Sequence, residues 1–429
     1  MVLVAGGMAG MLVASGVSVA ARPQVKRSAS GSGPISWWVP SPSPIPGTLH
    51  AAAKAFTKKT GIQVNVESVP WSSYLTKLTT AIASGQGPDV AEIGNTWSST
   101  FANTGGFLPW TSSMFKAIGG EGKFLKTSMG VTGIPGKPPI SVPFLGQTWV
   151  MLYNKGLFKK AGIASPPRTW AQFNLDAKKL TDPSKGVYAL AYQAGSSSAL
   201  GTWMWIMFRQ FGGNMYNAKG QVDLTSPQDV NAVTQLVRWV YPLQFVNPAN
   251  VADSTGTIAT TEFEQGKAAM YFNQSPNVAK TPPGGYGLSY IPLEEPTPPG
   301  GAKIMSHVAG ENLAIFDKTT HLAEDLEFIN FLTSPAEQAS INQKMYELPV
   351  TPAGLKAPAF QTPTEKIFGE ILAKYAAPMP TNASSANVQL DMSDAMISLE
   401  RTDIGSHNIT PSAVKAALAS AQATVQAAG

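Results

Sequence analysis

The chain has 429 residues, enough for two or three domains, and 43% of them are hydrophobic while only 13% are charged. This balance supplies large cores and excludes a disordered chain. The net charge is +5, but the basic residues are scattered singly or as lysine pairs, so no nucleic-acid partner is expected. Cysteine is absent, which removes disulfides, thiolate metal ligands, a cysteine nucleophile and a lipidation cysteine.

The N-terminal segment carries no charge over residues 2–21, is rich in glycine and alanine, and precedes a cluster of basic residues. Residues 18–20 (SVA) offer a small-residue cleavage site, so residues 1–28 are predicted to be a signal peptide. Positive residues before the apolar stretch are missing, which leaves a retained membrane anchor as the alternative. Residues 29–33 are predicted to be a linker.

Strands and helices then alternate along the chain. ISWWV (35–39), IQVNVESV (62–69) and PDVAEIG (88–94) have the short apolar or alternating pattern of strands. The segments between them, 49–61 and 71–85, have apolar residues at helical spacing and end on glycine. This β-α-β-α-β order predicts a parallel sheet with right-handed crossovers.

The rest of the chain continues in the same style. Helices are predicted to start after the capping residues Thr169, Ser226 and Ser334, and the Ala-rich segment 411–426 is predicted to be a C-terminal helix. Four short apolar segments read as strands: 186–192, 268–272, 286–291 and 311–316. We therefore expect an α/β protein with more than one lobe.

Several segments in order resemble one protein family. FTKKTGIQVNVESV, TTAIASGQGPDVAEIGNTW and VPFLGQTWVMLYNKGLFKKAGI, followed by FEQGKAAMYF and EDLEFINFLTSPAEQ, are similar to extracellular solute-binding proteins of bacterial ABC importers, closest to the maltose-binding-protein-like, carbohydrate-binding group. The resemblance covers roughly residues 35–425. It implies an α/β periplasmic-binding-protein-like fold, in which two lobes joined by hinge strands enclose a ligand cleft.

The resemblance also implies how the chain divides. Lobe 1 would comprise residues 34–145 plus 310–365, and lobe 2 residues 148–306 plus 370–429. The chain would cross between the lobes near residues 144–148, 307–310 and 373–380.

Ligands of open α/β sheets bind beyond the carboxyl ends of strands. That rule selects the loop 40–46 after the first strand, residues 67–71 after the second, and residues 95–97 after the third. Sugars need hydrogen-bonding side chains for their hydroxyls and aromatic rings for their C–H faces. The candidates in these segments, or just before them in the first strand, are Trp38, Ser41, Glu67, Asn95, Thr96 and Trp97. Glu67 has an alternative role as a cap of the following helix.

Further candidates come from the resemblance. Gln147 stands where the maltose-binding protein has a ligand carboxylate, and Trp203 and Trp205 stand where family members carry aromatic cleft residues. The others are Asn273, Gln274 and Ser275, which replace an aromatic-bearing loop, and Gly310 and Glu311, at a crossover that commonly touches sugar. Trp203 and Trp205 have an alternative interpretation as core residues, and Glu311 as a hinge residue.

The function implied is a substrate-binding receptor that captures a di- or oligosaccharide by hinge closure and delivers it to a membrane permease driven by a separate ATPase chain. We expect a monomer in the periplasm or at the extracellular face of the membrane. The alternatives are a two-lobe binder of a phosphate ester, peptide or chelated metal, and a secreted glycosidase.

No metal, cofactor or catalytic site is expected. The four histidines, His50, His307, His321 and His407, show no ligand spacing. G-x-S-x-G, H-E-x-x-H and P-loop motifs do not occur in the sequence, and no G-x-G-x-x-G follows a strand.

Overall fold

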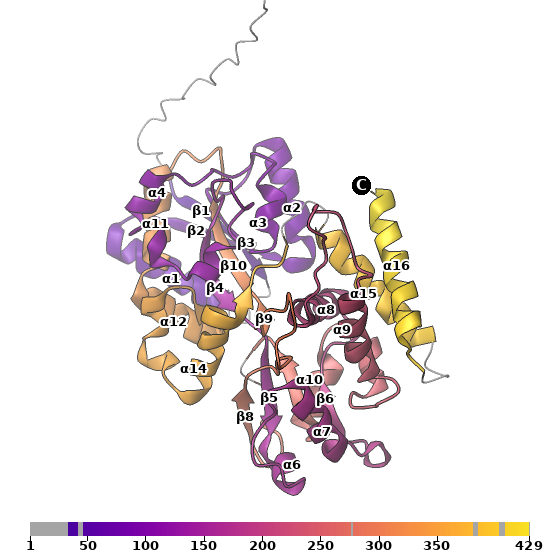
Figure 1. Cartoon of the computed structure of the whole chain (residues 1–429). Helices are drawn as coiled ribbons and strands as arrows, with labels where there is room; N and C mark the ends of the chain where they lie inside the picture. Colours follow the sequence, from indigo (N-terminus) through magenta and orange to yellow (C-terminus); the bar gives the residue numbers. More distant parts are fainter. Residues whose placement is uncertain (1–32, 42–45, 276–277, 381–384, 403–407, 429) are drawn as a thin grey trace, which may run out of the picture.

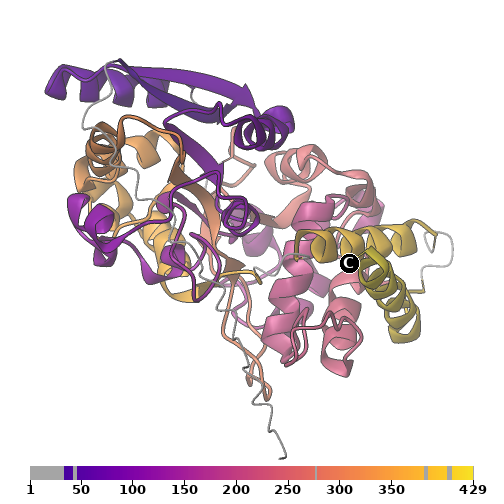
Figure 2. The same cartoon turned by 90° about the horizontal axis from the view of Figure 1, so that it is seen from above.

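The structure is a computed structural model that describes residues 33–41, 46–275, 278–380, 385–402 and 408–428. The predicted signal peptide and all but the last residue of the predicted linker lie outside these ranges. In Figures 1 and 2 the described chain forms two bodies side by side, one built mostly from the first and the late-middle parts of the sequence, the other from the middle and the C-terminus.

The first body is built on a six-stranded sheet with the order β11-β4-β10-β3-β1-β2. As predicted, β1 pairs in parallel with both β2 and β3. β10 comes from far along the chain, lies between β3 and β4, and runs antiparallel to both. The strands are β1 (Ile35–Ser41), β2 (Val64–Pro70), β3 (Val90–Gly94), β4 (Val142–Gln147), β10 (Ala309–Ile315) and β11 (Leu348–Pro349).

Helices cover both faces of this sheet because its strands carry apolar side chains on both sides. One face packs against α1 (Pro46–Thr60), α4 (Ser112–Ala117), α11 (Leu322–Leu332) and α12 (Pro335–Met345). The other face packs against α2 (Trp71–Ser84) and α3 (Trp97–Phe101). Three shorter helices are α5 (Lys126–Met129), α13 (Pro352–Leu355) and α14 (Pro363–Glu370).

The second body is built on a four-stranded sheet with the order β6-β7-β5-β8. Its strands are β5 (Val150–Asn154), β6 (Tyr188–Ala191), β7 (Ala268–Asn273) and β8 (Tyr286–Ser289). The helices of this part of the chain are α6 (Lys155–Lys160), α7 (Trp170–Leu180), α8 (Ser197–Phe211), α9 (Pro227–Arg238) and α10 (Thr257–Glu264). The C-terminal helices α15 (Ser385–Thr402) and α16 (Pro411–Ala428) pack against α8 and α9, as the yellow helices of Figure 1 show.

Short segments link the two sheets. Only Thr148 and Trp149 separate β4 from β5, and the Trp149 backbone N–H donates to Ser306 Oγ at 2.8 Å. β9 (Ser306–His307) precedes β10 and pairs in parallel with β12 (Ala376–Ala377). The two sheets draw their strands from different parts of the chain, and the division into lobes that the resemblance implies stays a prediction.

The helix starts predicted from capping residues are confirmed. The side chains of Thr169, Ser226 and Ser334 accept hydrogen bonds from backbone N–H groups in the first turns of α7, α9 and α12, respectively. Each bond satisfies a donor that the helix itself leaves unpaired.

Candidate ligand site at the carboxyl edges of the two sheets

The carboxyl ends of the parallel strands meet between the two sheets. β3 and β4 are parallel to each other because β10 runs antiparallel to both. In the second sheet β6 and β7 are parallel, and β5 runs antiparallel to β7. The carboxyl end of β7 therefore lies beside the start of β5, just beyond the end of β4. The topology thus places the binding edges of both sheets at the linking segments.

Four of the predicted residues converge there. Gln147 pairs with Ala309, and Gly146 pairs with Gly310. The backbone N–H of Asn95 donates to the Gly310 carbonyl at 3.0 Å, and Asn95 Nδ2 donates to the Val308 carbonyl at 3.1 Å. The structure therefore brings Asn95, Gln147, Gly310 and Glu311 together, and commits the Asn95 Nδ2 to holding the start of β10.

The second sheet contributes to the same edge. Asn273 is the last residue of β7 and pairs with Val150, the first residue of β5. Its Nδ2 donates to the Ser275 carbonyl at 3.2 Å, so the turn after β7 is folded back on itself. Asn273, Gln274 and Ser275 are all partly buried. They lie opposite the first sheet's edge, and their contact with a ligand stays a prediction.

Aromatic rings gather at the ends of β1, β2 and β3. Trp97, at the start of α3, and Trp71, at the start of α2, meet edge to face with centroids 5.0 Å apart, and Tyr74 lies 6.1 Å from each. Both tryptophans are partly exposed. The Trp97 ring packs over Gly94, since a Cβ at that position would lie 3.4 Å from the ring. This pair is the most suitable stacking surface at the edge.

Other predicted residues at this edge have partners of their own. Lys77 Nζ lies 4.0 Å from the centroid of the Trp38 ring, and Lys77 also forms an ion pair with Glu67. Glu67 therefore does not cap the following helix through its side chain. Thr96 is exposed at the start of α3, and Ser41 ends β1 beside Pro70. The loop 42–45 lies outside the described residues.

The structure corrects the interpretation of Trp203 and Trp205 as cleft residues. Both lie on α8, which is buried nearly all round, and their exposed fractions are 0% and 2%. Trp203 stacks on Phe272 with centroids 4.6 Å apart. A helix whose apolar residues face every direction is a core helix, so these rings hold the second body together.

Two further carboxyl groups, which the sequence analysis did not select, lie at the candidate site: those of Glu92 and Glu347. Glu311 lies opposite both Gly94 and Leu145, so its side chain is on the same face of the sheet as Glu92, two residues before Gly94. Glu347 precedes β11 and accepts a hydrogen bond from the Gln147 side-chain amide. In the sequence, each of these two glutamates is marked only by being a single acidic residue in, or next to, an apolar strand.

Burial controls the charge of this carboxyl row. The exposed fractions of Glu92 and Glu347 are 2% and 7%, and each of the three glutamates has its Oε2 buried without a hydrogen-bond partner. Burial raises the pKa of Glu311 to about 7. Burial first, and then the Glu311 carboxyl, raise the pKa of Glu92 and of Glu347 well above the ordinary value. The three groups are therefore not all ionised at neutral pH.

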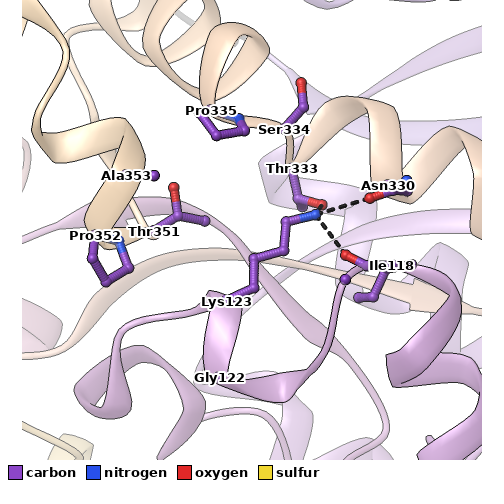
Figure 3. A pocket seen from close by; sticks show the side chains of 11 residues that line it. Ile118, Gly122, Lys123, Asn330, Thr333, Ser334, Pro335, Thr351, Pro352 and Ala353 are labelled. Carbon is purple, nitrogen blue, oxygen red and sulfur yellow. Dashed lines mark hydrogen bonds between the residues drawn. The ribbon is translucent and has the colours of Figure 1, made fainter.

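A separate cavity of about 390 Å³ lies within the first body (Figure 3). Its floor is Lys123, whose pKa burial lowers to about 8. Lys123 Nζ donates to the Ile118 carbonyl at 2.8 Å, Asn330 Oδ1 at 3.1 Å and Thr333 Oγ1 at 2.8 Å. These bonds use all three donors of the ammonium, so Lys123 holds the ends of α4 and α11 and has no donor left for a ligand.

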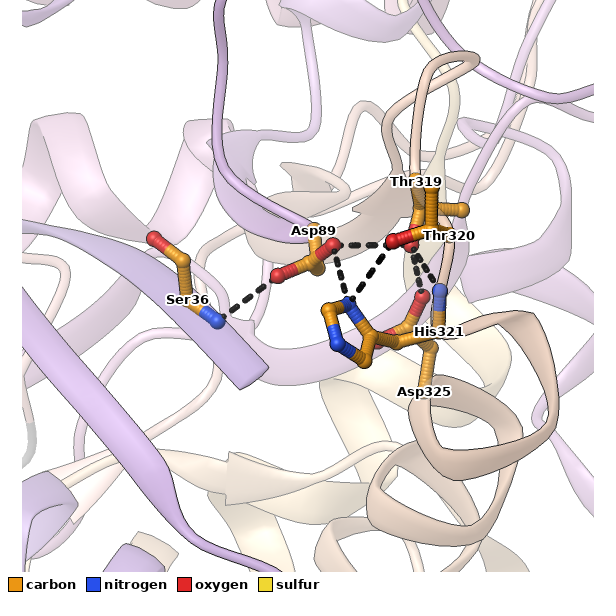
Figure 4. A network of polar contacts seen from close by, with 6 residues as sticks. All are labelled: Ser36, Asp89, Thr319, Thr320, His321 and Asp325. Atoms are coloured by element: carbon orange, nitrogen blue, oxygen red, sulfur yellow. Dashed lines mark hydrogen bonds and ion pairs between the residues drawn. The ribbon is translucent and has the colours of Figure 1, made fainter. Parts of the chain in front are cut away.

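A polar network lies at the opposite edge of the same sheet (Figure 4). Asp89 accepts from the Ser36 backbone N–H at 2.8 Å and lies 3.1 Å from His321 Nδ1. Thr319 Oγ1 lies 2.9 Å from Asp89 Oδ1 and 2.7 Å from Asp325 Oδ2. Because a hydroxyl has one proton, one carboxyl must donate to it. Burial raises the pKa of Asp325 to about 8, so Asp325 is that donor.

Asp325→Asn is expected to flatten the pH dependence of stability. The folded state keeps the Asp325 proton from the ordinary pKa of 3.8 up to about 8, whereas the unfolded chain releases it near 3.8, so stability falls as pH rises through this window. The contribution to the slope approaches about 1.4 kcal/mol per pH unit and should vanish in the variant. Urea unfolding at several pH values measures it, and equal slopes in both proteins would contradict the assignment.

Comparison with known proteins identifies the family. The sequence model for bacterial extracellular solute-binding proteins matches residues 40–339, and the chain belongs to that family. It is 27% identical over 308 residues, 69% of this chain and 71% of the other, to a Brucella abortus protein named only as a binding protein. It is 25% identical over 317 residues, 70% of this chain and 69% of the other, to a maltooligosaccharide ABC transporter solute-binding lipoprotein of Streptococcus pneumoniae.

Solved structures confirm the two-lobe fold. The sugar-binding protein MalE of Xanthomonas citri superimposes with a TM-score of 0.79 at 19% identity, covering 92% of this chain and 98% of its own. The family is one of binding proteins. Within the described ranges, no helix is long and apolar enough to cross a membrane.

Proposed function

We propose that the chain is the substrate-binding receptor of an ABC importer and that it captures a carbohydrate between the carboxyl edges of its two sheets. The observation that carries the proposal is that the partly exposed Trp71 and Trp97 rings lie at the same edge of the first sheet as Gln147 and Glu311. Aromatic faces and hydrogen-bonding groups side by side match the two surfaces of a sugar ring.

Capture requires closure of one body on the other. Asn273 ends a strand of the second sheet and Gln274 and Ser275 follow it, so we expect a ligand held on the first sheet to meet them when the bodies approach. A ligand that contacts both bodies favours the closed population in proportion to its differential affinity. The closed form would then dock on a membrane permease, with a separate chain supplying ATP hydrolysis, at the outer face of the membrane or in a periplasm.

One relative raises an anionic ligand as the alternative to a sugar. The chain is 25% identical over 287 residues, 64% of its length, to an sn-glycerol-3-phosphate-binding periplasmic protein of Salmonella typhimurium. Phosphate recognition uses arginine, lysine or free backbone N–H groups. The candidate residues of this edge are amides, carboxyls, hydroxyls, tryptophans and a glycine, which supports the sugar instead.

Thermal shift against mono-, di- and oligosaccharides, with glycerol phosphates and short peptides in parallel, tests the proposal. A ligand at 100 times its dissociation constant should add roughly 2.7 kcal/mol to the stability of the folded state. A melting shift with one sugar class, recovered chemically unchanged, supports the receptor. A shift with anions or peptides alone would refute the sugar assignment, and a cleaved sugar would refute the binding-protein mechanism.

Trp97→Ala is expected to weaken the binding of that sugar about tenfold, because the ring provides a rigid stacking face that water does not replace. Trp97→Phe keeps an aromatic face and should lose much less. Isothermal titration measures both affinities. Equal affinities in the alanine variant and the wild type would remove Trp97 from the site.

A further inference from the structure

The carboxyl row of Glu92, Glu311 and Glu347 has no cationic partner. In the parts of the chain that the structure describes, none of the three forms an ion pair with lysine, arginine or histidine. Gln147 provides one amide donor, to Glu347. The Oε2 atoms of all three glutamates are left without a donor although they are buried. An unpaired buried carboxylate is costly, so burial favours protonated Glu92 and Glu347, while the less buried Glu311 is open to donors from outside the protein.

Glu311 is the member of the row best placed to meet them. Glu92 and Glu347 are more than nine-tenths buried, whereas Glu311 is only partly buried. It follows Gly310, whose carbonyl accepts from Asn95, so its backbone is fixed at the edge where the two sheets meet. Burial favours the uncharged form of the two glutamates behind it, so Glu311 is the member of the row that carries the negative charge above neutral pH.

We propose that Glu311 determines ligand specificity: its carboxyl group accepts hydrogen bonds from hydroxyl or ammonium groups of the ligand and rejects ligands that carry phosphate or carboxylate. This inference rests on the proposed sugar-binding function and narrows it to uncharged sugars, polyols and amino sugars. An anion placed beside Glu311 would meet an ionised carboxyl group that forms no ion pair with any described cation, so like-charge repulsion and desolvation both oppose its binding.

The test compares wild type, Glu311→Gln and a matched control, Glu121→Gln, which is exposed on the first body. Isothermal titration at about pH 8, where the Glu311 carboxyl is mostly ionised, would use a neutral maltooligosaccharide, a glucosamine oligosaccharide, glucose 6-phosphate and sn-glycerol 3-phosphate. Glu311→Gln should lower the affinity for the sugar that binds by about tenfold, because a hydrogen bond to a charged acceptor becomes one to a neutral acceptor.

The expected pattern also includes no measurable binding of either phosphate to the wild type, and unchanged affinities in Glu121→Gln. Glu311→Asp, which keeps the charge but shortens the side chain, covers the case in which the glutamine variant does not fold. If sugars bind the wild type but Glu311→Gln leaves their affinities unchanged, the inference fails and the proposed function stands. Phosphate binding as tight as that of the parent sugar also overturns the inference. If no sugar binds the wild type, both fail.

Discussion

Trp203→Ala should lower the free energy of unfolding by about 3–5 kcal/mol, the usual cost of deleting a large aromatic side chain from a core. The indole is fully buried, stacks on Phe272, and lies 5.1 Å from the Trp149 ring. Removing it leaves a cavity between α8 and the second sheet that neighbouring side chains fill only in part. Urea unfolding followed by circular dichroism measures the change.

The control is Leu175→Ala on α7, because Leu175 is 57% exposed and its loss should change stability by no more than about 0.5 kcal/mol. Trp203→Ala protein that still folds should bind sugar with nearly unchanged affinity. A stability close to wild type combined with lost sugar binding would mean that Trp203 is a ligand platform after all.

Gly310→Ala is the second large effect. Gly310 has φ +123°, and a Cβ there would lie 2.0 Å from the Leu145 carbonyl oxygen. That oxygen belongs to β4, so it can yield only if the pairing of β4 with β10 opens. Backbone strain of about 1–3 kcal/mol adds to a steric cost of about 1–3 kcal/mol. The free energy of unfolding of the variant should fall by about their sum, so it should unfold at a lower denaturant concentration.

Gly120→Ala separates the cost of backbone strain from the steric cost. Gly120 has φ +94°, and a Cβ there would meet nothing within 4 Å, so its substitution carries the backbone strain without the steric cost. Gly310→Ala should therefore be clearly less stable than Gly120→Ala in the same denaturation experiment. Equal losses would show that β4 and β10 can separate cheaply at this point.

Local patterns predicted much of the fold. The first strands and helices follow apolar spacing within a single segment, and Thr169, Ser226 and Ser334 announce their helices through bonds to the next turn. The position of β10 between β3 and β4 could not be predicted by periodicity, since it joins segments more than 160 residues apart, such as Asn312 and Pro143. The family resemblance assigned residues 310–365 to lobe 1 but did not predict where in the sheet β10 would lie.

The residues of the candidate site also differ in how far the sequence predicted them. Asn95 follows a predicted strand, so the strand-end rule found it, and the resemblance found Gln147, Gly310 and Glu311. Trp203 was misplaced because a helix that is apolar all round has no polar stripe to reveal which way it faces. Glu347 was missed because its closeness to Gln147 depends on a pairing between β4 and β11 that no local pattern encodes.

A crystal structure of the complex with the sugar that raises the melting temperature would show directly where the ligand binds. We expect the sugar between the two sheets, stacked on Trp97 or Trp71, hydrogen-bonded to Glu311, and contacted from the other side by residues 273–275. A sugar held by one body alone, for example in the cavity beside Lys123, would contradict this expectation.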